Sequence, residues 1–220
     1  GREYMLIDTA GLRRKSSVRE ELEQFSVIQA IRSLDRADVA VLVIDAAQGL
    51  TAQDKKIAGV VANRGRACII AVNKWDLIER DTHTADEWVK SLRHEMPFIA
   101  WAPIVTTSVV ENKRVHKLLG KVDEVFDRFT KRVPTADLNR FLEQALAMHS
   151  PPVVRNRRLK FYYVSQVATR PPSFVYMVNY PKSVPASYKR FLENRLREQY
   201  DFDGTPVRTM VRARRRTEWD

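Results

Sequence analysis

The sequence is poor in several features that would assign it to a familiar class of protein. Its 220 residues include one cysteine, Cys68, which excludes an internal disulfide and fits a reducing compartment. No apolar segment approaches the length of about eighteen consecutive residues that suggests a membrane span. The N-terminus has no signal-peptide pattern. The four histidines stand far apart, without the spacing of a zinc site. These absences favour a globular protein of the cytoplasm.

Basic residues are concentrated in the C-terminal part of the chain. Residues 134–220 hold 16 Lys and Arg against 8 Asp and Glu, whereas residues 1–133 hold 22 against 19. Such asymmetry predicts a polyanionic partner, a nucleic acid or an anionic membrane, for the C-terminal part alone. If that partner is RNA, the candidate phosphate contacts are Arg155, Arg157, Arg158, Arg212, Arg214, Arg215 and Arg216.

Apolar runs alternate with amphipathic stretches through residues 1–133. We expect strands at residues 4–7, 38–45, 67–72 and 99–105, and helices at 21–34, 51–63, 85–94 and 113–131. Thr51, with Asp54 three residues later, has the spacing of a helix N-cap, and Cys68 is expected to be a small core side chain. Continuous apolar runs are typical of parallel strands covered on both faces. The first 133 residues are therefore predicted to form a doubly wound α/β domain.

The pattern changes near Val133. Helices are expected at residues 137–148 and 187–199, and aromatic or β-branched strands at 160–167, 174–180 and 207–211. This α-β-β-α-β order predicts a second domain of the α+β class over residues 134–220. Tyr162, Tyr163, Phe174 and Tyr176 lie in its strands, and alternation places at least half of them in the core.

Two short motifs follow predicted strands, where ligands bind in sheets of this kind. Asp8-Thr9-Ala10-Gly11 combines a carboxylate, which can hold the water shell of a magnesium ion, with a glycine whose backbone can approach a phosphate. Asn73-Lys74-Trp75-Asp76 ends in a carboxylate that can accept two hydrogen bonds from the donor pair of guanine. A plain turn is the alternative interpretation of each motif.

The order of these motifs, followed by Thr107-Ser108-Val109, resembles that of the translation-factor-like GTPases. The resemblance implies that Asp8 contacts magnesium through water, that Gly11 donates its N–H to the γ-phosphate, and that Asn73, Lys74 and Asp76 bind guanine. It also implies that the N–H groups of Ser108 and Val109 meet the guanine oxygen. Val109 departs from the alanine that is common there.

Leu12 stands where Ras-like GTPases place a water-orienting glutamine. Either it packs the loop, or the chain is one of the GTPases with a hydrophobic replacement, several of which use a potassium ion; both interpretations stay open. Thr9, Ala10 and Leu12 are expected to line the nucleotide together with the residues named above. The phosphate loop, Gly-x-x-x-x-Gly-Lys-Ser/Thr, occurs nowhere in the sequence, so we expect a portion of a longer protein.

The C-terminal part sharpens the resemblance through three segments: Asn179-Tyr180-Pro181, the run from Tyr188 to Asn194, and the run from Phe202 to Val207. They resemble the end of the bacterial Der (EngA) tandem GTPases, which carry a KH-like domain. The resemblance implies a partial P-loop GTPase-type sheet followed by a KH-like domain, with GTP or GDP as ligand, magnesium as cofactor and no membrane partner. It further implies GTP hydrolysis in large-subunit ribosome assembly, with ribosomal RNA or a subunit precursor as partner. The alternatives are a non-catalytic RNA-binding module, a docking platform and a degenerate GTPase scaffold. The sequence indicates no oligomeric state.

Overall fold

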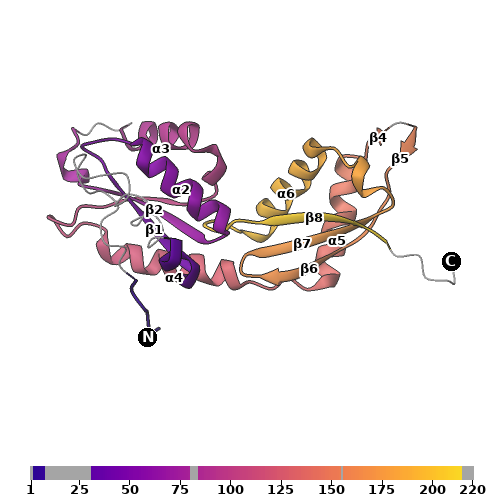
Figure 1. Cartoon of the computed structure of the whole chain (residues 1–220), viewed down its shortest axis with the longest axis horizontal. Coiled ribbons are helices and arrows are strands. Elements are labelled where there is room, and N and C mark those ends of the chain that lie inside the picture. The colour runs from indigo at the N-terminus through magenta and orange to yellow at the C-terminus, as the bar shows by residue number, and fades with distance from the viewer. Residues whose placement is uncertain (1, 8–30, 80–83, 155, 215–220) are drawn as a thin grey trace. The chain divides into compact units, whose positions relative to one another are not determined.

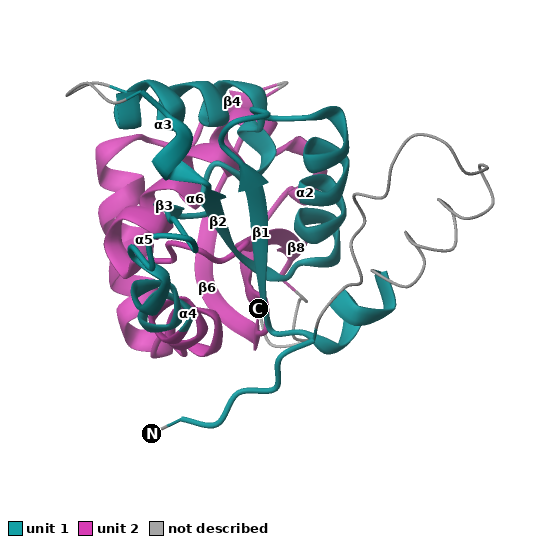
Figure 2. Ribbon diagram, turned by 90° about the vertical axis from the view of Figure 1, so that its left-hand side faces the viewer, with its two compact units in different colours: residues 1–122 teal, residues 123–220 magenta. Residues whose placement is uncertain are grey.

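The computed structural model describes residues 2–7, 31–79, 84–154 and 156–214. The chain divides into two compact units, residues 1–122 and 123–220, coloured separately in Figure 2. The division falls within helix α4 (Val115–Thr130). The domain bounds of 1–133 and 134–220 expected from the sequence stay a prediction.

The first unit, residues 1–122, is built on a parallel sheet. The three strands follow one another in the order β1-β2-β3, with β2 in the centre. The elements labelled in Figure 1 are β1 (Val39–Asp45), α2 (Ala52–Arg64), β2 (Ala67–Asn73), η1 (Trp75–Leu77), α3 (Thr84–Glu95), η2 (Pro97–Ile99), β3 (Ile104–Thr106) and the start of α4. The predicted α/β class with a parallel sheet is confirmed.

Local sequence signals explain where these elements begin and end. Thr51 caps α2: its hydroxyl accepts a hydrogen bond from the Asp54 N–H (3.2 Å), and Asp54 Oδ2 accepts one from the Thr51 N–H (3.0 Å). Gly65 ends the helix at φ +67°, a left-handed conformation that favours glycine. Side chains from β1, β2, α2 and α3 share one core, in which Cys68 is buried, as predicted. Burial also raises the pKa of the Cys68 thiol to about 12.

Two predicted strands of this unit are wrong in whole or in part. Residues 4–7 form no strand, and the side chains of Tyr4, Met5 and Leu6 are exposed. An apolar run becomes a strand only where another strand supplies its hydrogen bonds. Residues 99–105 shorten to β3, since η2 and a turn in which the Ala102 N–H donates to the Ile99 carbonyl (2.9 Å) occupy the first part. Ile99 and Ala102 are buried, and an apolar run of this kind fits either a buried strand or the observed 3₁₀ helix and turn.

The second unit, residues 123–220, is an α+β unit. Its elements are the end of α4, α5 (Thr135–Met148), β4 (Val153–Val154), β5 (Arg157–Arg158), β6 (Phe161–Thr169), β7 (Pro172–Val178), η3 (Pro181–Ser183), α6 (Ala186–Tyr200) and β8 (Arg208–Ala213). The main sheet has the order β6-β7-β8, with β6 antiparallel and β8 parallel to β7. The predicted α-β-β-α-β order is confirmed, and the short β4-β5 hairpin is an addition to it.

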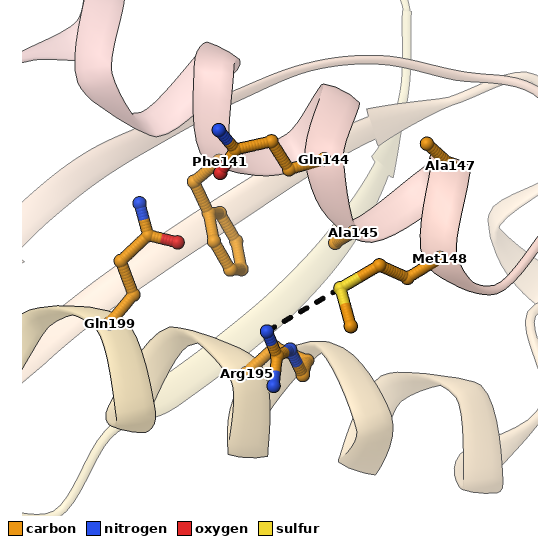
Figure 3. A pocket seen from close by; sticks show the side chains of 7 residues that line it. All are labelled: Phe141, Gln144, Ala145, Ala147, Met148, Arg195 and Gln199. Atoms are coloured by element: carbon orange, nitrogen blue, oxygen red, sulfur yellow. Dashed lines mark hydrogen bonds between the residues drawn. The ribbon is translucent and has the colours of Figure 1, made fainter.

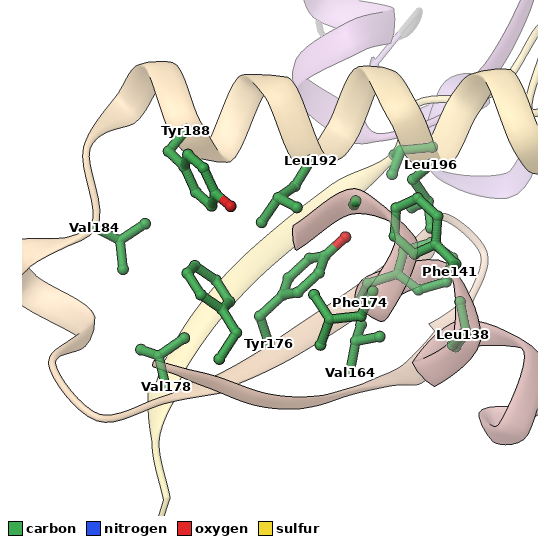
Figure 4. Close-up of a cluster of buried hydrophobic side chains, with 14 of the residues drawn as sticks. Leu138, Phe141, Val164, Phe174, Tyr176, Val178, Val184, Tyr188, Leu192 and Leu196 are labelled. Carbon is green, nitrogen blue, oxygen red and sulfur yellow. The ribbon is translucent and has the colours of Figure 1, made fainter. Parts of the chain in front are cut away.

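Helices α5 and α6 provide the apolar side chains that cover one face of this sheet. Figure 4 shows Tyr188, Leu192 and Leu196 of α6 directed towards Phe174 and Tyr176 of β7. Phe174 and Tyr176 are 0% and 1% exposed, so both belong to the core. No helix among the described residues is long and apolar enough to cross a bilayer.

Candidate functional site

The carboxyl ends of the three parallel strands in the first unit bring the sequence motifs together. The register pairs Asp45 at the end of β1 with Asn73 at the end of β2, and Val72 with Thr106 at the end of β3. Loops that leave this edge of an open α/β sheet are where such folds bind ligands. Asn73-Lys74-Trp75-Asp76 and Thr107-Ser108-Val109 therefore lie next to each other, as the sequence pattern predicts.

Backbone hydrogen bonds hold these loops in place. The Ala46 N–H donates to the Asn73 carbonyl (2.8 Å), and the Trp75 N–H donates to the Thr107 carbonyl (3.1 Å). The Asn73 side chain adds a link, because its Oδ1 accepts from the Thr107 hydroxyl and from the Val109 N–H, both at 3.3 Å. Asn73 therefore joins the second and third motifs.

Lys74 is held by a buried carboxylate. Its ammonium lies 2.8 Å from Asp45 Oδ2, and the Asp45 side chain is 6% exposed whereas that of Lys74 is 51% exposed. Asp45 Oδ1 also accepts from the Ala47 N–H (3.0 Å). The hydrogen bond from Lys74 lowers the pKa of Asp45, which keeps it ionised against the cost of burial. Lys74 has φ +59°, a left-handed conformation that directs the chain sharply out of β2.

Asp76 lies in the first turn of the short helix η1. One of its carboxylate oxygens, Oδ1, is buried. The preceding residue, Trp75, is 8% exposed and packs edge-on against Trp88 of α3, with ring centroids 5.9 Å apart. Trp75 thus anchors the turn from which Asp76 extends.

The third loop is ordered by its own backbone. Ser108 pairs with Lys113 through two hydrogen bonds, of 3.1 Å from the Ser108 N–H and 2.8 Å to the Ser108 carbonyl. The Ser108 hydroxyl accepts from the Glu111 N–H (3.1 Å). In this structure the N–H groups of Ser108 and Val109 therefore have partners within the chain, and their contact with guanine stays a prediction.

Several predicted site residues cannot be placed. Asp8, Thr9, Ala10, Gly11 and Leu12 lie outside the described residues. Within residues 2–7, 31–79, 84–154 and 156–214, no three His, Cys, Asp or Glu side chains lie close enough to hold a metal ion. The magnesium prediction, which rests on Asp8, is untested.

Four of the seven candidate RNA contacts lie among the described residues of the second unit. Arg155, Arg215 and Arg216 lie outside the described residues, and Arg157 lies in β5. Arg158, Arg212 and Arg214 are exposed. Asn179 fixes the segment that leads from β5 to β6, because its Nδ2 donates to the Arg158 carbonyl (2.9 Å) and its Oδ1 accepts from the Lys160 N–H (2.9 Å).

Two grooves among the described residues are lined by side chains outside these motifs. The groove between α5 and α6 has a volume of about 340 Å³ and is lined mainly by Phe141, Ala145 and Met148 (Figure 3). Of the seven residues that line it, Arg195 alone is charged; it pairs with Glu198 and donates to Met148 Sδ at 3.4 Å. Such a groove lacks the converging polar groups of a nucleotide site.

Asp45 is the functional candidate that the sequence reasoning missed. The signal was present, since Asp45 directly ends an apolar strand, as Asp8 does in the first motif. Its partner, Lys74, is distant in the sequence, and only the parallel pairing of β1 with β2 brings the two side chains together.

Comparisons with known proteins agree with this arrangement. Residues 2–128 match the family model for the elongation factor Tu GTP binding domain, and residues 132–212 match that for the KH-domain-like C-terminal region of EngA bacterial GTPase enzymes. GTPase Der of Syntrophobacter fumaroxidans is 47% identical over 218 residues, 99% of this chain and 49% of that protein. GTPase Der of Clostridium perfringens is 48% identical over 212 residues, 96% of this chain and 48% of that protein.

Solved structures give a weaker likeness. Era of Aquifex aeolicus bound to GDP and aluminium fluoride is 16% identical, covers 93% of this chain and 75% of its own, and has a TM-score of 0.43. Era in complex with MgGDPNP and a segment of 16S ribosomal RNA has a TM-score of 0.44 at 16% identity, over 93% of this chain and 74% of its own. The chain spans about half the length of the curated relatives it matches. On the two family matches and the identity to these relatives, the chain belongs to the bacterial Der (EngA) GTPase family, with a translation-factor-type GTP-binding region followed by the family's KH-like domain.

Proposed function

We propose that the whole protein binds and hydrolyses GTP as a factor in assembly of the large ribosomal subunit in the cytoplasm. In this proposal the present chain supplies the guanine-binding loops and a basic unit that contacts ribosomal RNA. The observation that carries it is the convergence of Asn73, Asp76 and the Ser108 loop at one edge of the parallel sheet, linked through Asn73 Oδ1. Guanine recognition needs these groups gathered around a single planar base.

The proposed roles follow from the chemistry of guanine. Asp76 accepts two hydrogen bonds from N1–H and the exocyclic amine, a donor pair that adenine lacks. Asn73 braces the second loop against the third, and the methylenes of Lys74 lie along the base while Asp45 holds its ammonium. The N–H groups of Ser108 and Val109 exchange their present partners for the guanine oxygen.

The phosphate side of the site is proposed from the first motif. Asp8 binds magnesium through water, Gly11 donates its N–H to the γ-phosphate, and Thr9, Ala10 and Leu12 line the same loop. These roles rest on the motif and on the family match over residues 2–128. Because the 220 residues contain no phosphate-loop sequence, we propose that this chain alone does not hydrolyse GTP. A requirement of the whole protein for potassium fits Leu12 in place of glutamine.

The nucleotide assignment is tested by changing base specificity in the whole protein. Asp76→Asn reverses the donor and acceptor pattern that guanine requires and suits xanthine instead. We expect the preference for GTP over xanthosine triphosphate to change by about a hundredfold in favour of the latter, since hydrogen bonds to charged groups each contribute about 1.5–3 kcal/mol. Glu79→Gln is the matched control, because Glu79 is an exposed carboxylate shortly after the motif. An unchanged GTP preference in Asp76→Asn overturns the assignment.

A second candidate function is an RNA-binding module without turnover. It is favoured by the net charge of residues 134–220, with 16 basic against 8 acidic residues. Titration of the chain with ribosomal RNA at several salt concentrations tests it, because each phosphate contact lowers the logarithm of affinity in proportion to the logarithm of salt. A flat salt response excludes arginine–phosphate contacts as the basis of binding.

A further inference from the structure

The outer face of the sheet β6-β7-β8, which points away from α5 and α6, carries two tyrosines side by side in sequence. The pairing register shifts between Phe161 and Tyr163, so that Tyr162 is an extra residue in β6. Such a bulge breaks the strict alternation of side chains and re-aims one of them. Tyr163 pairs with Met177, whose neighbours in β7 point into the core, and it therefore faces outwards with 39% of its surface exposed.

Arginines of β8 complete this face. Met177 pairs on its other side with Arg212, which places Tyr163, Met177 and Arg212 in one row across the three strands. Arg214 directly follows the last residue of β8, and its N–H donates to the Val178 carbonyl of β7 (3.3 Å). Its guanidinium carbon lies 5.3 Å from the centroid of the Tyr162 ring, so that Tyr162 and Arg214 lie together beside this row.

A second cation reaches the same ring. The Lys160 ammonium lies 5.5 Å from the centroid of Tyr162, within the range of a cation–π interaction. The Lys160 backbone is fixed by Asn179, which accepts its N–H and donates its own backbone N–H to the Lys160 carbonyl (3.1 Å). The backbone of Lys160 is therefore held by two hydrogen bonds, and its ammonium lies over the Tyr162 ring.

The three strands that form the face contain no acidic residue. The sequence contains no Asp or Glu between Glu143 and Glu193, and strand β8 contains none either. The strands β6, β7 and β8 thus present aromatic rings and cations without a carboxylate of their own. We name this surface the tyrosine–arginine face, defined by Lys160, Tyr162, Tyr163, Met177, Arg212 and Arg214.

We propose that the tyrosine–arginine face binds single-stranded RNA, with a base stacked on Tyr163 and phosphates held by Arg212, Arg214 and Lys160. The proposal rests on the RNA-contacting role proposed above and specifies its ligand. Exposed aromatic rings beside cations bind unpaired bases, because every base has a flat face that stacks on a ring while its phosphate meets the charge. A duplex hides those base faces, which favours an unpaired strand as the ligand.

The test measures binding of the 220-residue chain to three fluorescein-labelled strands of equal length: oligouridylate, an abasic ribose-phosphate strand and an RNA duplex. The wild type is expected to bind oligouridylate about tenfold more tightly than the abasic strand, from one stacked base. Tyr163→Ala removes that difference and Tyr163→Phe keeps it, because stacking needs the ring and not the hydroxyl. Arg212→Gln weakens binding to both single strands and lowers the salt slope by about one. Val167→Ala truncates another exposed side chain of β6 and is the control.

Distinct results overturn distinct claims. If Tyr163→Ala binds oligouridylate as Val167→Ala does, while the wild type still binds ribosomal RNA, the stacking site is wrong and the RNA-contacting role stands. If the wild type binds none of the RNA strands, the stacking site and the RNA-contacting role are both wrong. If polyglutamate competes as well as oligouridylate at equal charge, the face recognises acidic chains and the proposal is overturned. Ultraviolet crosslinking of oligouridylate to the wild type is expected to label the peptide that contains Tyr163, and labelling confined to other peptides contradicts it.

Discussion

Gly204 gives the sharpest test of how the second unit is packed. Its φ of +78° is left-handed, and a Cβ built there would lie 2.3 Å from Cγ2 and 2.9 Å from Cγ1 of Val125 in α4. Val125 is fully buried. The loop around the glycine is itself held, because the Arg197 guanidinium donates to the carbonyls of Phe202 (3.3 Å) and Thr205 (3.0 Å). In Gly204→Ala, both the Val125 side chain and the backbone of the loop are therefore held in place, and neither moves easily to make room for the new methyl group.

The expected loss follows from two contributions. A left-handed conformation costs an L-residue about 1–2 kcal/mol, and an extra methyl in a packed core costs about 1–3 kcal/mol. We expect Gly204→Ala to destabilise the second unit by about 3 kcal/mol. Val125→Ala removes both atoms that the new methyl meets at the shortest distances, and by itself it costs about 2 kcal/mol for the cavity. In the double variant the steric contribution is largely relieved, since only the contact with the Val125 Cβ (3.1 Å) is left, and the backbone contribution remains.

Hydrogen exchange of the whole chain, followed by mass spectrometry, measures this prediction. Peptides from β7 in Gly204→Ala are expected to exchange on the order of a hundredfold faster, since each 1.4 kcal/mol is a factor of ten. Peptides from β2 in the first unit provide the internal control. The double variant is expected to be more stable than the sum of the two single losses implies. Strict additivity refutes the steric reasoning.

Three further predictions concern buried polar groups. The pKa of Asp45 is lowered in the folded state, so its pairing with Lys74 stabilises the first unit at pH values above the ordinary pKa of 3.8, and this stabilisation is lost as the pH falls through the folded-state pKa. Asp45→Asn should therefore flatten the acid side of the pH profile of stability measured by urea unfolding. An unchanged pH profile contradicts this. The Tyr176 hydroxyl is buried and has no hydrogen-bond partner among the described residues, so Tyr176→Phe should raise stability by about 1 kcal/mol in thermal unfolding, and a decrease argues against this. Gln166 accepts from the Val133 N–H at 2.8 Å and donates to the Lys131 carbonyl at 2.9 Å; Gln166→Leu should cost about 3 kcal/mol by leaving both groups unsatisfied, and a loss below about 1 kcal/mol is the opposing result.

Local signals in the sequence predicted the helices of the described residues well, whereas most of the helix expected at residues 21–34 lies outside them. The capping residues Thr51 and Asp54 were identified from their spacing, and the helix that follows ends at Gly65. The buried position of Cys68 followed from its apolar run. Such signals succeed because caps and apolar periodicity involve residues within a few positions of each other.

Strands were predicted less well, since a strand needs a partner that its own sequence does not contain. Residues 4–7 are apolar yet form no strand, and most of residues 99–105 form a turn and a 3₁₀ helix that bury the same side chains. The site motifs were found from the sequence because each follows an apolar run, but their roles towards the nucleotide stay predictions.

The sequence by itself determined the family, the order of the motifs, the α/β then α+β succession and the basic character of the C-terminal part, because these depend on residue types and short spacings. Only the tertiary structure decided that Asp45 holds Lys74 and that Asn73 joins the loop at Val109, since parallel pairing brings together residues that are distant along the chain. It also separated the tyrosines: Tyr176 is in the core, whereas a bulge leaves Tyr163 outside. The register of a sheet, which no single strand encodes, makes that choice.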